Sequence, residues 1–131
     1  MSPTFELKVI GKYQIVVLRE SLKDAERMSD LKKIMETFLD EDKKFIAINL
    51  ENTEIIHSYF IKILTINYKK LRQRKGRLCV IGANGVILNL MQLLNIDKYI
   101  TVYPSEEAFS NSLSILGKLD KMDNEIDINT H

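Results

Sequence analysis

Short apolar runs alternate along this chain with segments whose apolar residues recur at helical spacing. Two of the runs, Phe45 to Leu50 and Leu78 to Ile81, are almost continuously apolar, which is typical of strands covered on both faces of a sheet. A helical pattern follows each of them, beginning near Ser58 after the first and near Ile87 after the second. Strand–helix–strand units with right-handed crossovers are therefore predicted, and they restrict the chain to an α/β fold.

The two ends of the chain extend this pattern. Phe5 to Val9 alternates apolar and charged residues, and a turn at Gly11-Lys12 leads into a second strand from Tyr13 to Leu18, which together predict an antiparallel hairpin. A last strand is predicted from Tyr99 to Tyr103, with Pro104 in the first turn of a final helix. The predicted order is ββαβαβαβα: a single mixed β-sheet with the hairpin at one side and helices packed mainly on one face.

Apolar residues at helical spacing define the faces of three of the predicted helices. They are Met28, Leu31, Met35 and Phe38 in the first; Ile61, Leu64, Tyr68 and Leu71 in the second; and Ala108, Phe109, Leu113 and Leu116 in the last. Gly76 is a suitable C-terminal stop for the second helix. The pattern fades after Gly117, so we expect one domain over residues 1–118 and a flexible tail over residues 119–131.

Composition limits the class of protein. A chain of 131 residues fits one domain, and a net charge of +1 does not favour a nucleic-acid-binding domain, which is usually strongly basic. Cys79 is the only cysteine, so no internal disulfide can form and a cytoplasmic location is expected. Glu6 and Lys8 interrupt the first apolar run, which is therefore no signal peptide. No apolar run approaches the length of a membrane span.

Residues with catalytic or metal-binding chemistry are few. The two histidines are His57 and His131, and Cys79 lies within a predicted buried strand, so no metal-ligand spacing exists. The turn from Gly82 to Gly85 could hold a phosphate, but it lacks the known glycine-rich patterns and a plain turn is the simpler interpretation. The basic run from Lys69 to Arg77 suits a solvated helix end. We therefore expect no enzyme activity and no cofactor.

Ser58 stands where a helix is predicted to begin. Its hydroxyl could cap the free N–H groups of the first turn, which is the simpler interpretation. The same position also tolerates a phosphate well, because those N–H groups and the helix dipole favour negative charge.

Several segments together resemble the STAS domain, a family that includes bacterial anti-sigma factor antagonists and the cytoplasmic tails of sulfate transporters. In that family an Asp-Leu-Ser-like run ends the third strand, and Asp-Ser-Ser-Gly-Leu-Gly opens the next helix. Here Asn49-Leu50-Glu51 and the run from His57 to Lys62 stand at the same spacing. Gly76, the run from Leu93 to Ile96 and the helix start from Ser105 to Ala108 also match. The resemblance covers residues 5–116 and implies the STAS fold.

The resemblance also implies a function. In the antagonists, the first serine of the motif is phosphorylated by a kinase that is itself the anti-sigma factor, and a phosphatase reverses the modification. By position this role falls on Ser58. The sequence departs from the motif at the acidic residue before the serine (His57), the second serine (Tyr59), the two glycines (Phe60 and Lys62) and the acidic residue of the third strand (Asn49).

We therefore expect a bacterial regulatory module that binds an anti-sigma factor of the serine kinase type. The predicted docking surface consists of Ile56, His57, Ser58, Tyr59, Phe60 and Lys62, with the two aromatic rings as anchors unless they pack inward. The alternatives are a STAS module that binds a small ligand or nucleotide, and a scaffold subunit of a signalling or transporter-associated complex. A monomer or weak dimer is expected.

Overall fold

The computed structural model describes residues 5–19, 25–54, 56 and 58–115. The predicted tail, residues 119–131, lies outside the described part. The elements are β1 Phe5–Ile10, β2 Tyr13–Leu18, α1 Ala25–Asp40, β3 Phe45–Asn49, α2 Ser58–Gln73, β4 Arg77–Ile81, α3 Gly85–Leu93, the 3-10 helix η1 Ile96–Lys98 and β5 Thr101–Tyr103. Residues 106–115 are also helical and are called the last helix below.

The strands form one five-stranded sheet in the order β1-β2-β3-β4-β5. β1 pairs with β2 antiparallel, with Ile10 opposite Tyr13, and the other neighbours pair in parallel. The turn between β1 and β2 uses Gly11, whose φ of 58° lies in the left-handed region that glycine adopts without cost. The predicted mixed sheet, with its hairpin at one side, is confirmed.

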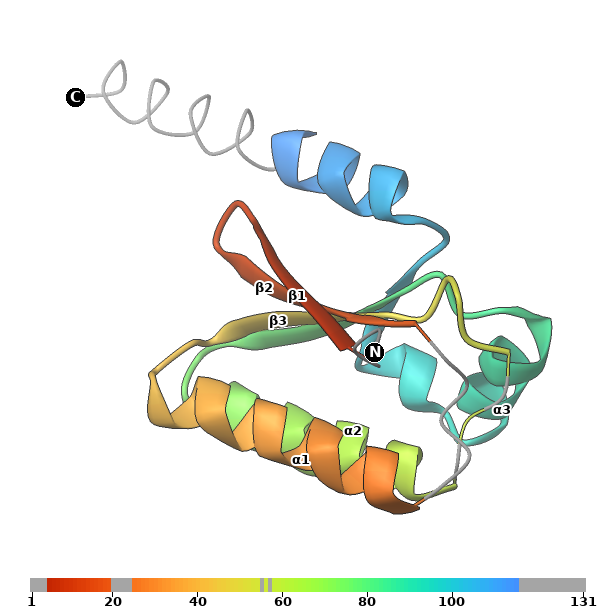
Figure 1. The fold of residues 1–131 in the computed structure, drawn as a ribbon. Helices are drawn as coiled ribbons and strands as arrows, with labels where there is room; N and C mark the ends of the chain where they lie inside the picture. The colour runs from red at the N-terminus through yellow and green to blue at the C-terminus, as the bar shows by residue number, and fades with distance from the viewer. Residues whose placement is uncertain (1–4, 20–24, 55, 57, 116–131) are drawn as a thin grey trace.

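Helices cover both faces of the sheet. Figure 1 shows α1, α2 and α3 below the sheet and the last helix above it. On the lower face, Val16, Ile48 and Val80 belong to a core shared with α1 and α2. On the upper face, Ile15 and Cys79 pack with Phe109 of the last helix. Alternate residues of each central strand are thus buried on opposite faces, which explains the continuous apolar runs.

Two details of the helices differ from the sequence-based expectation. Pro104 precedes the last helix instead of opening it, and Ser105 caps the helix by accepting a hydrogen bond from the Ala108 N–H at 3.1 Å. In α2 the buried residues are Phe60, Ile63, Leu64, Asn67 and Leu71. The buried arc is turned relative to the predicted stripe because α2 packs against α1 as well as against the sheet.

Candidate functional site

Ser58 is exposed at the first residue of α2, a helix of 16 residues with no acidic residue in its first turn. Within the described part of the chain its hydroxyl takes part in no hydrogen bond. An N-cap residue precedes the first residue of a helix, whereas Ser58 is itself the first residue of α2. The simpler interpretation of Ser58 as a helix cap is therefore not supported. A negative charge here would face the free N–H groups and the positive end of the helix dipole.

The segment that leads from β3 to α2 is held by side chains from distant parts of the chain. The Asn84 side chain donates hydrogen bonds to the backbone oxygens of Thr53 at 2.9 Å and Glu54 at 3.2 Å. Its side-chain oxygen accepts from the Ile87 N–H at 3.0 Å and thereby caps α3. Asn84 therefore joins Thr53 and Glu54, in the loop after β3, to the start of α3.

A second set of hydrogen bonds joins this segment to the last helix. The buried Asn49 accepts from the Glu51 N–H at 2.8 Å and donates to the Glu106 carboxylate at 3.0 Å. Lys8 pairs with the same carboxylate at 2.6 Å. The Glu51 carboxylate accepts from the Glu106 N–H at 2.7 Å, at the positive end of the last helix. An amide at position 49 suits this arrangement, since an aspartate could not donate to Glu106.

The residues predicted to dock a partner do not all reach the surface. Phe60 is fully buried in the lower core, so its ring packs inward and is not available as an anchor. Ile56 and Tyr59 are half-buried and pack against the same core. Lys62 is exposed, with its ammonium 5.7 Å from the centre of the Tyr59 ring. His57 lies outside the described residues. Ile56, Ser58, Tyr59 and Lys62 thus form the surface around the start of α2.

The glycine-rich turn after β4 has structural uses. Gly82 has a φ of 71°, and a Cβ there would lie 2.2 Å from the Glu51 side chain. Asn84 is committed to the hydrogen bonds described above. The turn therefore serves close packing and helix capping, which agrees with the plain-turn interpretation. No signal in the sequence singled out Asn84, although an asparagine directly before an apolar helix is a common cap.

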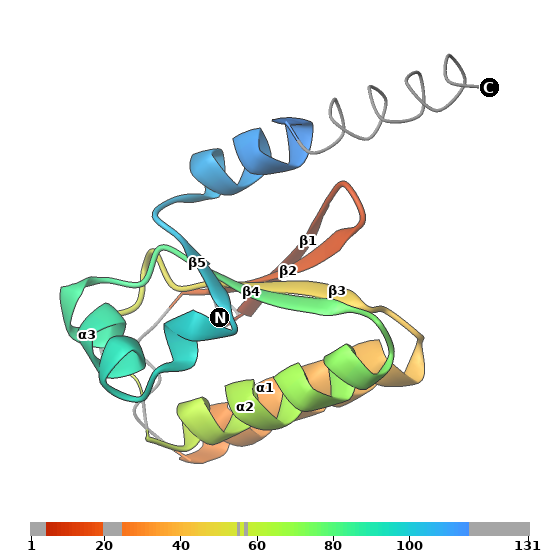
Figure 2. The ribbon, with the colours of Figure 1, turned by 180° about the vertical axis from the view of Figure 1, so that it is seen from behind.

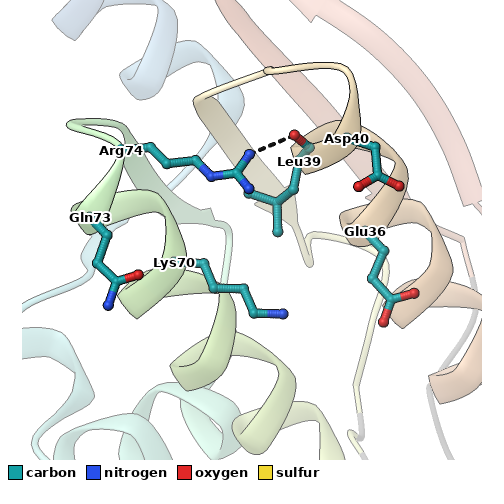
Figure 3. Close-up of a pocket in the computed structure, with 6 residues that line it drawn as sticks. All are labelled: Glu36, Leu39, Asp40, Lys70, Gln73 and Arg74. Atoms are coloured by element: carbon teal, nitrogen blue, oxygen red, sulfur yellow. Dashed lines mark hydrogen bonds between the residues drawn. The ribbon is translucent and has the colours of Figure 1, made fainter.

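A pocket of about 240 Å³ lies between the C-terminal ends of α1 and α2. Figure 3 shows Glu36 and Asp40 on one side and Lys70, Gln73 and Arg74 on the other. The Arg74 guanidinium donates to the Leu39 carbonyl at 2.6 Å. The charges of the two sides balance, and Arg74 satisfies a carbonyl at the end of α1. This pocket is best explained as the place where contacts such as the Arg74–Leu39 hydrogen bond hold the ends of α1 and α2 together.

Cys79 is not suited to nucleophilic chemistry. Its side chain is fully buried, and burial raises the pKa of the thiol above its ordinary value. A protonated, inaccessible thiol is a poor nucleophile. Among the described residues, no group of three or more histidine, cysteine, aspartate or glutamate side chains is placed to hold a metal ion. In the same part of the chain, no helix has the length and apolar character that crossing a membrane requires.

Comparison with known proteins identifies the family. The model of the STAS domain matches residues 5–109, so the chain belongs to the STAS domain family. A search of the curated proteins finds no match.

Solved structures share the fold at low sequence identity. A Thermotoga maritima protein with a proposed role as anti-sigma factor antagonist is 21% identical, with a TM-score of 0.74 over 82% of this chain and 92% of that one. An anti-sigma factor antagonist from Mycobacterium paratuberculosis is 21% identical, with a TM-score of 0.70 over the same shares. The Bacillus cell fate determinant SpoIIAA in its phosphorylated form is 14% identical, with a TM-score of 0.67 over 82% of this chain and 98% of that one.

Proposed function

We propose that this protein is a regulatory protein-binding module of the anti-sigma factor antagonist type. It binds an anti-sigma factor that is also a serine kinase, and phosphorylation of Ser58 by that partner releases it. A serine phosphatase restores the binding form. Sigma factors act on transcription in the bacterial cytoplasm, so the proposal places the protein there. The proposed role is binding and needs no catalytic group of its own.

The observation that carries the proposal is the exposed Ser58 at the start of α2. The hydroxyl is accessible to a kinase, and a phosphate there would be partly stabilised by the helix N-terminus, so the fold can persist after modification. The added charge of about −1.5 to −2 would lie beside the half-buried Ile56 and Tyr59. A partner docking on these apolar groups would have to desolvate the phosphate, which disfavours binding.

The proposed docking surface is Ile56, His57, Ser58, Tyr59 and Lys62. Phe60 is left out because its ring is buried. Lys62 stands where the family motif has a glycine, and its charge lies one helical turn from Ser58. We therefore expect the partner to differ from those of family members that carry the glycine-rich motif.

The test uses the partner recovered with the tagged protein from its source bacterium and identified by mass spectrometry. Its affinity for wild type, Ser58→Ala and Ser58→Asp is measured by calorimetry, with circular dichroism as a check of folding. Ser114→Asp is the matched control, because Ser114 is exposed on the last helix at the opposite face of the sheet. We expect weakened binding for Ser58→Asp alone. Equal affinities for Ser58→Asp and Ser114→Asp would contradict the switch.

Phosphate transfer is a separate readout. The partner should label wild type with phosphate from ATP and should not label Ser58→Ala. Labelling of Ser58→Ala at the wild-type level would place the modification elsewhere. No specific observation favours the alternative of a small ligand at Gly82 to Gly85, since these residues already pack against Glu51 and cap α3.

A further inference from the structure

Two tyrosines form a partly exposed aromatic pair at the edge of the molecule, away from Ser58. Tyr68 of α2 and Tyr99, which precedes β5, have ring centroids 4.8 Å apart with a tilt of 44°. Tyr99 is 40% exposed, whereas Tyr68 is half-buried and packs against the lower core. The Arg72 guanidinium lies 3.4 Å from the Tyr68 hydroxyl. Large aromatic side chains with this exposure, held by a neighbouring arginine, are typical of protein contact surfaces.

A surface hollow lies on either side of this pair. One, of about 340 Å³, is lined by Thr65, Tyr68, Lys69, Arg72 and Tyr99. The other, of about 220 Å³, is lined in part by Arg77 and Thr101 together with the same two tyrosines and Arg72. Both hollows are open to solvent, which does not suit a small molecule that must bury most of its surface. They suit an extended segment that passes over the tyrosines.

The charge of this surface has one sign. Lys69, Arg72 and Arg77 are its charged residues, and no aspartate or glutamate lines either hollow. Within the described residues none of the three forms an ion pair. The pocket between the ends of α1 and α2 is different, since there acidic and basic side chains are balanced. Positive charge without an ion-pair partner, around partly exposed aromatic rings, is complementary to an acidic partner.

The position at the sheet edge favours a polypeptide as the occupant. β5 is the terminal strand of the sheet, and Figure 2 shows it at the near edge with α2 below it. An open edge strand can accept an extended segment of another chain. The net charge of the whole protein, +1, argues against a nucleic acid, which would require a more basic domain.

From these observations we propose that the surface made by Tyr68, Tyr99, Lys69, Arg72 and Arg77 is a second binding site, which takes an acidic, extended polypeptide segment. This second site goes beyond the proposed function, because its residues do not include Ser58. Arg72 follows Ser58 by fourteen residues of the same helix, a distance of about 21 Å along the axis. A charge at Ser58 is therefore more than two Debye lengths of about 8 Å away.

The test titrates the full chain, labelled with ¹⁵N, with a synthetic peptide that alternates glutamate with valine. A lysine–valine peptide of the same length, a nucleoside triphosphate and a single-stranded oligonucleotide are the comparison probes. We expect saturable binding of the acidic peptide, with amide shifts centred on Lys69, Arg72, Tyr99 and Thr101. Shifts centred elsewhere, no saturable binding, or tighter binding of either nucleotide probe would overturn the proposal.

Variants make the test specific. Arg72→Glu and, separately, Tyr99→Ala should each weaken peptide binding about tenfold, as expected for arginine and tyrosine anchors. Lys33→Glu is the matched charge reversal, because Lys33 is exposed on α1 and lines neither hollow. It should leave affinity within about twofold. Equal losses for Arg72→Glu and Lys33→Glu would show non-specific attraction and overturn the site.

Ser58→Asp separates this proposal from the proposed function. It should leave binding of the acidic peptide unchanged while it weakens binding of the anti-sigma factor. Circular dichroism establishes that each variant is folded, and Tyr99→Ala keeps the site testable if Arg72→Glu does not fold. A loss of peptide binding in Ser58→Asp as large as that in Arg72→Glu would contradict a second, independent site.

Discussion

At the scale of single residues, the departures from the family motif have physical consequences. Phe60 takes a position where the motif has glycine, and its ring fills the lower core completely. Asn49 takes the position of an acidic residue, and both ends of its amide form hydrogen bonds. Phe60 and Asn49 therefore supply packing and hydrogen bonds around the site, while Ser58 is left exposed.

Asn49→Asp should destabilise the protein. The new carboxylate could not donate a hydrogen bond to Glu106. It would instead place a second negative charge beside the Glu106 carboxylate, to which the amide now donates at 3.0 Å. A cost of about 1–3 kcal/mol in the free energy of unfolding is expected. Urea unfolding measures it, with Asn89→Asp on the exposed side of α3 as the control. Equal stability of the two variants would show that the Asn49 amide is not needed.

The Cys79 thiol should be protected from thiol reagents, and its ionisation should lower the stability of the fold at alkaline pH. Burial raises the pKa of the folded thiol above its unfolded value of about 8.5. The stabilisation is present below the unfolded pKa and is lost as pH rises towards the folded value. When the pH rises above about 8.5, the free energy of unfolding should therefore fall more for wild type than for Cys79→Ala. Rapid reaction of the native thiol with Ellman's reagent would contradict the burial.

At the scale of elements, α2 ends in a Schellman motif. The Gly76 N–H donates to the Leu71 carbonyl at 2.7 Å, and the Lys75 N–H donates to the Arg72 carbonyl at 3.0 Å. Gly76 follows the helix as predicted, but the left-handed residue is Lys75, with a φ of 62°. Gly76 is needed for another reason, since a Cβ there would lie 2.2 Å from the Lys44 carbonyl oxygen.

Substitutions at these two neighbours should therefore act in opposite directions. Lys75→Gly relieves a left-handed lysine and should stabilise by about 1 kcal/mol. Gly76→Ala brings a methyl group against the Lys44 backbone and should destabilise by about 1–3 kcal/mol through overpacking. Thermal unfolding of both variants checks the signs. Destabilisation by Lys75→Gly would contradict the assignment of the left-handed position.

The elements could be predicted from the sequence where the pattern of apolar residues alone determines them. The apolar runs of β3 and β4 and the periodicity of α1 were sufficient to place these elements and the fold family. The face of the sheet on which the last helix packs was not predictable. The apolar strands β3 and β4 are buried on both faces, and their sequences do not indicate which helix covers which face. The hydrogen bonds of Asn49, Glu51 and Glu106 join residues more than 50 positions apart. They follow from topology, which local pattern does not contain.

At the scale of the whole molecule, the last helix is the helix that covers the upper face of the sheet within the described residues. Phe109 is fully buried, with its ring centroid 5.0 Å from that of Tyr13 and 5.2 Å from that of Tyr103. Phe109→Ala should cost about 3–5 kcal/mol of the free energy of unfolding. Ile115→Ala, at a side chain that is 58% exposed, is the control. Similar stability of the two variants would show that the last helix does not belong to the folded unit.

The proposed function makes the whole protein a switch that is controlled at Ser58. The most direct measurement compares the affinity of the recovered anti-sigma factor for the unmodified protein and for protein made with phosphoserine at position 58. We expect the phosphate to weaken binding about tenfold or more, because a partner must desolvate it, and to leave the circular dichroism spectrum unchanged. Equal affinity of the two forms, both folded, would show that Ser58 is not a switch.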